Sequence, residues 1–285
     1  MEPYYRILVL IILFFFGAIL GSFACCQAWR IRLKEQGKKS PGKWSVCLTC
    51  GKRLKTSENI PLLSWLAQRG KCKKCGAKIG ASEILSEFTF ALALPAVGNV
   101  FYDQFTDILA EGNFLKLAVL IFTALMLVVS ISIMWILLIY DAKWQKLPTF
   151  LLTILNISAI IYLILQIVGL ILNSAEISEI GVSLLKTLGA VAILPAPYFL
   201  LSTLSHEKLV GSGDWLVALP IALILGHWWL ALIALFLANF LGSIFGVFQR
   251  VKKGARQIPF GPFLIFAFII VYALQFWLLK LIVIV

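Results

Sequence analysis

Long apolar stretches dominate the pattern of hydrophobic and polar positions along the 285-residue chain. A stretch of roughly 20 apolar residues is enough for a helix to cross a bilayer. Stretches of this kind lie at about 5–29, 84–101, 115–140, 149–172, 181–204 and 259–285. Hydrophobic residues make up 61% of the sequence, which excludes a single soluble domain and predicts a polytopic membrane protein.

A further apolar stretch, residues 215–248, is too long for one span and carries Gly-His-Trp-Trp at 226–229 in its middle. Aromatic residues are typical of the membrane interface, so we predict two helices with a turn at this point. The first of them, 215–226, would be roughly 18 Å long, which is short for a full crossing. The pattern therefore predicts an all-α fold of about eight transmembrane helices with both termini outside.

The distribution of charge supports this count. The net charge is +12, and residues 30–80 hold fourteen of the 25 Lys and Arg with only two acids. Nucleic-acid binding is one interpretation of such a block, but a basic loop between spans is what the positive-inside rule places in the cytoplasm, where it also contacts anionic lipid. Only two crossings within 215–248 bring the basic segment 250–257 to the same side as this loop.

These boundaries predict three regions. Residues 1–29 form a first transmembrane helix, which we expect to be retained because its basic residues follow the apolar stretch instead of preceding it. Residues 30–83 form a basic cytoplasmic loop domain, and residues 84–285 form a transmembrane domain.

Four cysteines in the loop are spaced as two Cys-x-x-Cys pairs, Cys47 with Cys50 and Cys72 with Cys75. Two such pairs can surround one tetrahedral ion, and thiolates suit Zn²⁺. Two disulfides or four uncoordinated thiols are the alternatives, although a cytoplasmic location disfavours disulfides. We therefore predict a structural zinc site in a loop too small to have its own core. We expect Cys25 and Cys26, at the end of the first span, to be small buried residues.

Two acids stand at the edges of apolar stretches. Asp141 follows the third span, Asp214 precedes the sixth, and the charge distribution puts both at the cytoplasmic edge. A charged group at membrane depth is a functional candidate because it costs roughly 2.5–3.5 kcal/mol to insert. Two neighbouring carboxylates share a proton and can hydrolyse an amide without a covalent intermediate. The alternatives are that the acids are helix caps, for which Asp214 is well placed, or that they relay protons in a transporter.

Four elements, in this order, resemble the type IV prepilin peptidases, the leader peptidases of the A24 aspartic family. They are "GSF" at 21–23, the two cysteine pairs bracketing "NIPLLSWLAQRGKC" at 59–72, "YDAKWQKLP" at 140–148 and "GSGD" at 211–214. The resemblance covers nearly the whole chain.

The resemblance implies an inner-membrane aspartic endopeptidase that removes the basic leader of type IV prepilins or of type II secretion pseudopilins at the cytoplasmic face. Asp141 and Asp214 would be the catalytic pair, and Gly211 and Gly213 would let the backbone approach the scissile bond. Many members also methylate the new N-terminus with S-adenosylmethionine, an activity associated with the cysteine loop.

Expected partners are the prepilin or pseudopilin, membrane lipid and the pilus or type II secretion assembly machinery, with no nucleic acid. Glu58, Glu83 and Glu87 are candidate contacts for the basic leader. Glu87 also matches a family acid at the start of the second span, which implies a structural or substrate-orienting role. The family usually has Lys two residues after the second Asp, where this chain has Leu216, so Lys208 is the candidate for the missing cation. Because of this departure, the alternative function is a membrane scaffold or assembly protein that binds prepilins but is impaired in proteolysis.

Overall fold

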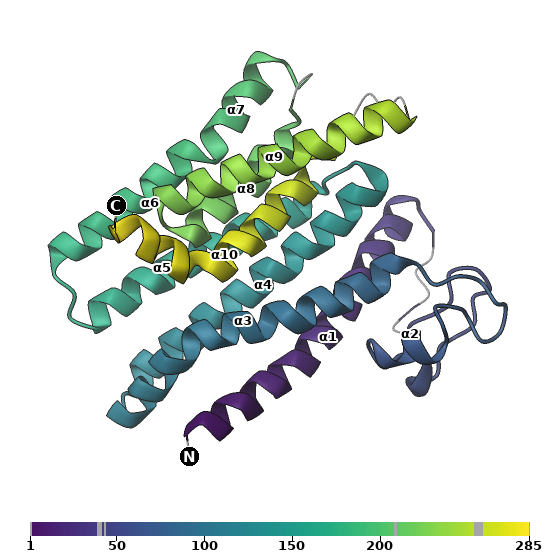
Figure 1. Cartoon of the computed structure of the whole chain (residues 1–285), viewed down its shortest axis with the longest axis horizontal. Coiled ribbons are helices and arrows are strands. Elements are labelled where there is room, and N and C mark those ends of the chain that lie inside the picture. The colour runs from purple at the N-terminus through teal and green to yellow at the C-terminus, as the bar shows by residue number, and fades with distance from the viewer. Residues whose placement is uncertain (1, 39–41, 43, 208–209, 254–258, 285) are drawn as a thin grey trace. The chain divides into compact units, whose positions relative to one another are not determined.

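The computed structural model describes residues 2–38, 42, 44–207, 210–253 and 259–284. Over these residues the chain is helical, and its β-structure is limited to two isolated bridges. The helices form two compact units, residues 1–102 and 103–285 (Figure 1). The predicted all-α class is confirmed.

Unit 1 is built on two helices that pack closely through small residues. These are α1 (Glu2–Glu35) and the first part of α3 (Ala81–Glu111). A Cβ atom added at Gly17 or Gly21 would overlap the α3 backbone at Phe90 or Ser86. The Ser86 hydroxyl also donates to the Gly21 carbonyl at 2.7 Å. This is the small-xxx-small contact by which helices approach each other within a membrane.

The loop between α1 and α3 contains two hairpins of the same design. The antiparallel bridges Val46–Arg53 and Lys71–Lys78 each close a Cys-x-x-Cys-Gly turn. The glycines that follow the cysteine pairs have φ of 67° and 68°, a conformation that favours glycine. Two short helices, η1 (Thr56–Glu58) and α2 (Leu63–Ala67), connect the hairpins.

Unit 2 is a bundle in which α8 lies at the centre. Its helices are α4 (Phe114–Trp144), α5 (Thr149–Leu172), α6 (Ile177–Ile193), α7 (Pro195–Leu204), α8 (Ser212–Leu225), α9 (Trp228–Lys253) and α10 (Gly261–Ile284). Helix α8 contacts α5, α6, α7, α9 and α10, while α10 also packs on α4 and α9 (Figure 1). Most of α8 beyond its first turns is buried; Val217, Ala218 and Ile221 are fully so.

Among the described residues, seven helical segments are long and apolar enough to cross a membrane, with α6 and α7 counted as one, and α8 is a shorter apolar helix. Helix α8 has 14 residues, or about 21 Å at the rise of an α-helix. Gly226 ends it in the left-handed conformation, which confirms the predicted division of 215–248. The predicted span 181–204 consists of α6 and α7 together, interrupted at Leu194 because the following Pro195 lacks a backbone donor.

Helix α3 is longer than the sequence pattern predicted. It continues to Glu111, beyond the apolar stretch at 84–101, and carries Asp103 and Asp107 on its extension. Pro95 lies inside the helix without ending it, and the helix ends before Gly112, whose φ is +69°. The apolar pattern identified the membrane-embedded part of this helix and missed its polar extension.

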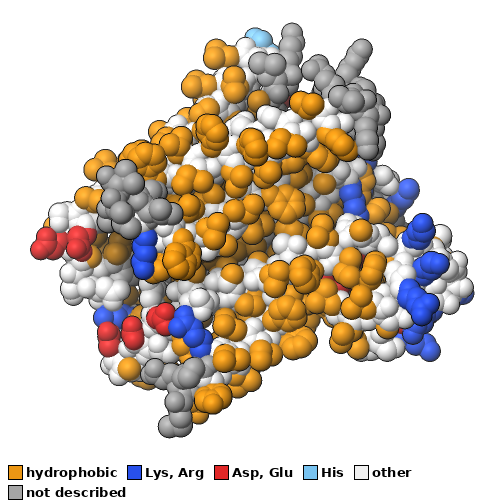
Figure 2. All heavy atoms as spheres, in the orientation of Figure 1, with side chains coloured by type: hydrophobic (Ala, Val, Ile, Leu, Met, Phe, Trp, Pro, Cys, Tyr) orange, Lys and Arg blue, Asp and Glu red, His pale blue; other side chains and the backbone are white. Residues whose placement is uncertain are grey.

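The outer surfaces of the helices are apolar. Large hydrophobic side chains such as Ile157, Leu188 and Phe236 are exposed, and hydrophobic side chains cover much of the face seen in Figure 2. Apolar surface of this extent is expected where helices face lipid. Many of the visible Lys and Arg side chains gather over the loop of unit 1 (Figure 2).

Candidate active site and metal centre

Asp141 lies in the last turn of α4 and is only 5% exposed. The helix ends at Trp144 because Gln145 adopts the left-handed conformation with φ of 51°. Pro148 then precedes the first residue of α5. The chain thus turns back within four residues, and this keeps Asp141 close to the start of α5.

Asp214 lies in the first turn of α8 and is half-buried. The N-cap position is occupied by Gly211, and the Asp214 amide donates to the Gly211 carbonyl at 3.2 Å. Asp214 therefore lies three residues after the N-cap and does not occupy the N-cap position itself. A carboxylate in the first turn still faces the positive end of the helix dipole, which favours its charged form.

The two acids come together at adjoining helix ends. Asp214 is close enough to Asp141 for their carboxylates to interact electrostatically. The backbone amide of Gly261, the first residue of α10, donates to Oδ2 of Asp141 at 3.1 Å in a buried position. The end of α4 and the starts of α8 and α10 thus form one site in unit 2.

Gly261 was not singled out by the sequence analysis. The available signal was "PFGP" at 259–262 directly before the last apolar stretch, where proline favours the first turn of a helix. Nothing in that pattern pointed to Asp141, which lies 120 positions earlier.

The predicted glycines differ in how tightly they are surrounded. A Cβ at Gly213 would lie 2.6 Å from Cδ1 of Leu147, whereas a Cβ at Gly211 would only approach Asp214 Oδ2 at 3.8 Å. The other methyl group of Leu147, Cδ2, would lie 3.8 Å from a Cβ added at Gly261. A side chain at Gly213 would therefore have to displace Leu147, while Gly211 has room for a side chain.

Asn156 on α5 connects to α8 at Leu216. Its Nδ2 donates to the carbonyl of Leu216 at 3.0 Å and to that of Leu152 at 2.8 Å. Its buried Oδ1 has no hydrogen-bond partner in the described part of the chain. This amide fixes the rotation of α8 about its axis relative to α5.

The four loop cysteines converge on one point. Their sulfur atoms all lie within 4.8 Å of one another, and Sγ of Cys47 is 3.8 Å from Sγ of Cys75 in the other hairpin. Four sulfurs at about 2.3 Å from a tetrahedral Zn²⁺ would be about 3.8 Å apart. The cluster can hold a metal ion, and its geometry fits zinc.

Electrostatics favour a cation at this point. The backbone amides of Cys75 and Lys74 donate to Cys72 and lower the pKa of its thiol to about 6. The Ala77 amide also lowers the pKa of Cys75, but burial and the neighbouring thiols outweigh it and raise this pKa to about 11. Some of the thiols thus ionise readily, and their negative charges disfavour ionisation of the remaining thiols. A divalent cation would compensate this repulsion and stabilise all four thiolates.

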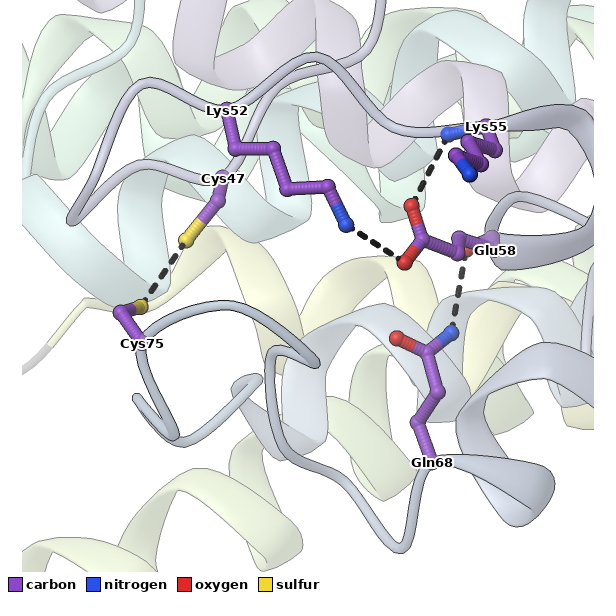
Figure 3. A network of polar contacts seen from close by, with 6 residues as sticks. All are labelled: Cys47, Lys52, Lys55, Glu58, Gln68 and Cys75. Carbon is purple, nitrogen blue, oxygen red and sulfur yellow. Dashed lines mark hydrogen bonds and ion pairs between the residues drawn. The ribbon is translucent and has the colours of Figure 1, made fainter.

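Glu58, a predicted substrate contact, has internal partners in the same loop (Figure 3). Its carboxylate accepts from Lys52 Nζ at 2.7 Å and from the Lys55 amide at 3.0 Å, and its carbonyl accepts from Gln68 at 3.3 Å. The bond from Lys52 and then that from the Lys55 amide hold the pKa of Glu58 below its usual value. Glu58 thus joins the first hairpin to α2.

Glu87 and Glu83 also lie within unit 1. Glu87 is 8% exposed, and its Oε2 accepts from the Leu62 amide at 2.6 Å. Glu83 accepts from the Ser82 hydroxyl at 2.9 Å. Lys208, the predicted substitute cation, lies outside the described residues.

A cavity of about 220 Å³ lies between α1, the hairpins and the start of α3. Its lining is mostly apolar and includes Trp29, Trp44 and Trp65, together with the charged residues Arg30 and Glu83. Nε of Arg30 and Nε1 of Trp65 are buried donors for which the described residues supply no acceptor. Unsatisfied buried donors are rare, and an acceptor from outside the described residues, such as a water molecule or a ligand, would complete them.

Together, the fold and these sites define a polytopic α-helical membrane protein with a carboxylate pair at adjoining helix ends and a separate four-cysteine loop. Residues 15–101 match the family model of the bacterial peptidase A24 N-terminal domain. No solved structure matches the chain.

Curated relatives extend this match over most of the sequence. The chain is 30% identical to the prepilin leader peptidase/N-methyltransferase of Dichelobacter nodosus, over 78% of this chain and 68% of the relative. It is 30% identical to the enzyme of that name from Pseudomonas aeruginosa, over 78% of this chain and 69% of the relative. It is 27% identical to the one from Vibrio cholerae, over 95% of this chain and 98% of the relative. The chain therefore belongs to the prepilin leader peptidase/N-methyltransferase family.

Proposed function

We propose that this protein is an aspartic endopeptidase of the bacterial inner membrane. It cleaves the basic leader from type IV prepilins or type II secretion pseudopilins at the cytoplasmic face and acts with the pilus or type II secretion assembly machinery. The observation that carries this proposal is the meeting of Asp141 and Asp214 at the ends of α4 and α8, with the Gly261 amide on Asp141. The names of the relatives support the substrate class.

The chemistry follows from two carboxylates that share one proton. The ionised member takes a proton from a water molecule, whose oxygen then attacks the carbonyl carbon of the scissile peptide bond. The protonated member donates to the carbonyl oxygen, giving a neutral tetrahedral diol. Collapse of this intermediate breaks the C–N bond, and the leaving amine takes up a proton. The pair acts as a unit, so the roles are not assigned to single residues.

The cytoplasmic orientation rests on charge. The basic segments 30–80 and 250–257 and the Lys143–Lys146 connection would lie on one side of the membrane. The end of α4 and the start of α10, which form part of the site, adjoin two of these segments in the sequence. A substrate helix inserted from this side would present the junction between its basic leader and its apolar part at the depth of the two acids.

The test is leader removal from a prepilin co-expressed with this protein in cells that lack their own leader peptidase. We expect cleavage by wild type and a loss of about 100-fold or more for Asp141→Asn and for Asp214→Asn, because either change removes a proton-transfer group. Asp107→Asn, which alters an exposed acid at the end of α3, is the matched control and should cleave as wild type does. Cleavage by both site variants would refute the dyad.

The alternative scaffold function makes a different prediction in the same experiment. Because Leu216 replaces the family's Lys, a chain that kept only binding would co-purify with uncleaved prepilin and show no mature product. Mature product from the wild type would exclude this alternative.

A structural zinc ion on Cys47, Cys50, Cys72 and Cys75 is the metal that we propose. The donor set and the sulfur spacing fit it. When bound, it would hold the two hairpins together, and it would take no part in peptide hydrolysis.

N-methylation of the new N-terminus is a second candidate activity, favoured by the cavity in unit 1 and by the relatives' names. S-adenosylmethionine supplies a methyl group, and Arg30 and Trp65 would offer their unsatisfied donors to its carboxylate. The mass of the mature N-terminus in the cleavage assay reports this activity. Trp65→Phe should yield a cleaved but unmethylated product.

A further inference from the structure

Asp141 stands where its own helix opposes its charge. It lies in the last turn of α4, and the C-terminal end of a helix carries a partial negative charge that disfavours a carboxylate. It is also buried, so water compensates little. A group outside α4 must therefore hold this carboxylate in a defined position.

The first residue of α10 supplies that group. The Gly261 amide donates to Asp141 Oδ2 at 3.1 Å from the positively polarised end of α10. A Cβ added at this position would lie 2.9 Å from the same oxygen. Asp141 Oδ2 thus accepts the hydrogen bond from Gly261 and also occupies the space that a side chain at position 261 would need. Any residue larger than glycine at this position would displace the carboxylate.

Leu147 determines how closely α8 and α10 approach each other here. Its Cδ1 fills the space beside Gly213, one residue before Asp214, and its Cδ2 approaches Gly261. The side chain therefore lies between the residue that holds Asp141 and the turn that carries Asp214.

We propose that Gly261 is a positioning residue of the dyad, holding the Asp141 carboxylate toward Asp214, and that Leu147 sets the separation of the two helix starts. This role rests on the proposed peptidase function. In this role, the "PFGP" segment contributes to catalysis by positioning Asp141 and does not itself contact the substrate.

The test compares Gly261→Ala with Gly169→Ala in the purified full-length protein, using a prepilin substrate in detergent or bicelles. Gly169 lies on α5, where an added Cβ would meet no atom within 4 Å. We expect Gly261→Ala to lower kcat at least roughly 10-fold with little change in KM, because a small displacement of a catalytic group costs rate and not binding. Gly169→Ala should match wild type in both constants.

Two further measurements keep the outcome decisive if Gly261→Ala folds poorly or if wild type is inactive. Leu147→Ala creates no clash and should also lower kcat with KM retained, while Leu125→Ala, at a half-exposed site on α4, should not. Infrared difference spectra against Asp141→Asn should show a carboxylate band that Gly261→Ala shifts and Gly169→Ala leaves in place.

These results separate the two proposals. An active wild type with equal kcat for both glycine variants, or an unmoved carboxylate band, would overturn the positioning role alone. Absence of cleavage by wild type together with a shifted band would overturn the peptidase function and leave the contact between Gly261 and Asp141 supported.

Discussion

Buried carboxylates in unit 1 are matched to specific donors. Glu58 and Glu87 are 6% and 8% exposed, and each accepts a backbone N–H from a loop residue. A buried charge without such a partner would cost several kcal/mol. The donor to Glu87 is Leu62, whose φ of 62° is unusual for a residue other than glycine. Both acids thus have partners within the loop region, and the leader contact predicted for them stays a prediction.

Glu87→Leu should destabilise the protein by about 1–3 kcal/mol, because the Leu62 amide loses its buried acceptor. Glu87→Gln keeps an acceptor and should cost less. Denaturant unfolding of the purified protein, followed by tryptophan fluorescence, measures both. Glu179→Leu, at an exposed acid in the first turn of α6, is the control. Unchanged stability together with a raised KM for prepilin would instead assign Glu87 to substrate binding.

At the scale of helices, the site depends on close approach. The turn of α8 that carries Asp214 contacts Leu147 through Gly213, and the start of α10 contacts the end of α4 through Gly261. Helices in membranes approach this closely only where a small residue leaves room. Glycine therefore determines the distance between elements at these two points.

Gly213→Ala should lower prepilin cleavage by roughly 10-fold, because its methyl group would displace Leu147 and move the first turn of α8. Combining it with Leu147→Ala should restore cleavage to the level of Leu147→Ala alone, since the clash is gone. Gly211→Ala is the matched control, because its Cβ would make only ordinary contact at 3.8 Å. If the double variant is as impaired as Gly213→Ala, packing against Leu147 is not the cause.

Apolar length and charge predicted the helical class and the division at Gly226, because the bilayer imposes both on any sequence. They did not predict that α3 continues to Glu111, since a polar helical extension has no apolar signal. They also missed the bond from Gly261 to Asp141, because partners 120 positions apart meet only through packing. The sequence identified Asp214 as an unusual acid at the edge of an apolar stretch. It did not predict that Asp214 lies in the first turn of α8 while Gly211 occupies the N-cap.

At the scale of the whole molecule, the cysteine cluster and the carboxylate pair belong to different units. The cluster lies within residues 1–102 and the acids within 103–285. The loop between α1 and α3 has little regular structure of its own, so a metal ion would supply much of its stability.

Metal analysis of the purified protein should find one zinc per chain. A strong chelator with a reductant should make residues 44–80 sensitive to protease, because the two hairpins would lose the ion that joins them. Mass spectrometry of the fragments locates the cuts, and cuts in this loop should precede any in unit 2. Cys72→Ser should reproduce the effect without chelator, whereas Cys26→Ser, outside the cluster, should not. Equal protease resistance with and without metal would contradict this prediction.

The length of α8 has a consequence for how this protein can vary. Gly211 at the N-cap and Gly226 in the left-handed conformation fix the two ends of the helix. Between them, the Asn156 side chain donates a hydrogen bond to the backbone carbonyl of Leu216. One residue inserted between Asp214 and Leu216 would turn Asp214 by about 100° and shift it by about 1.5 Å. An insertion that a surface loop would absorb would here point the carboxylate away from its partner. We therefore expect the spacing from Asp214 to Gly226 to tolerate substitution but not a change in length.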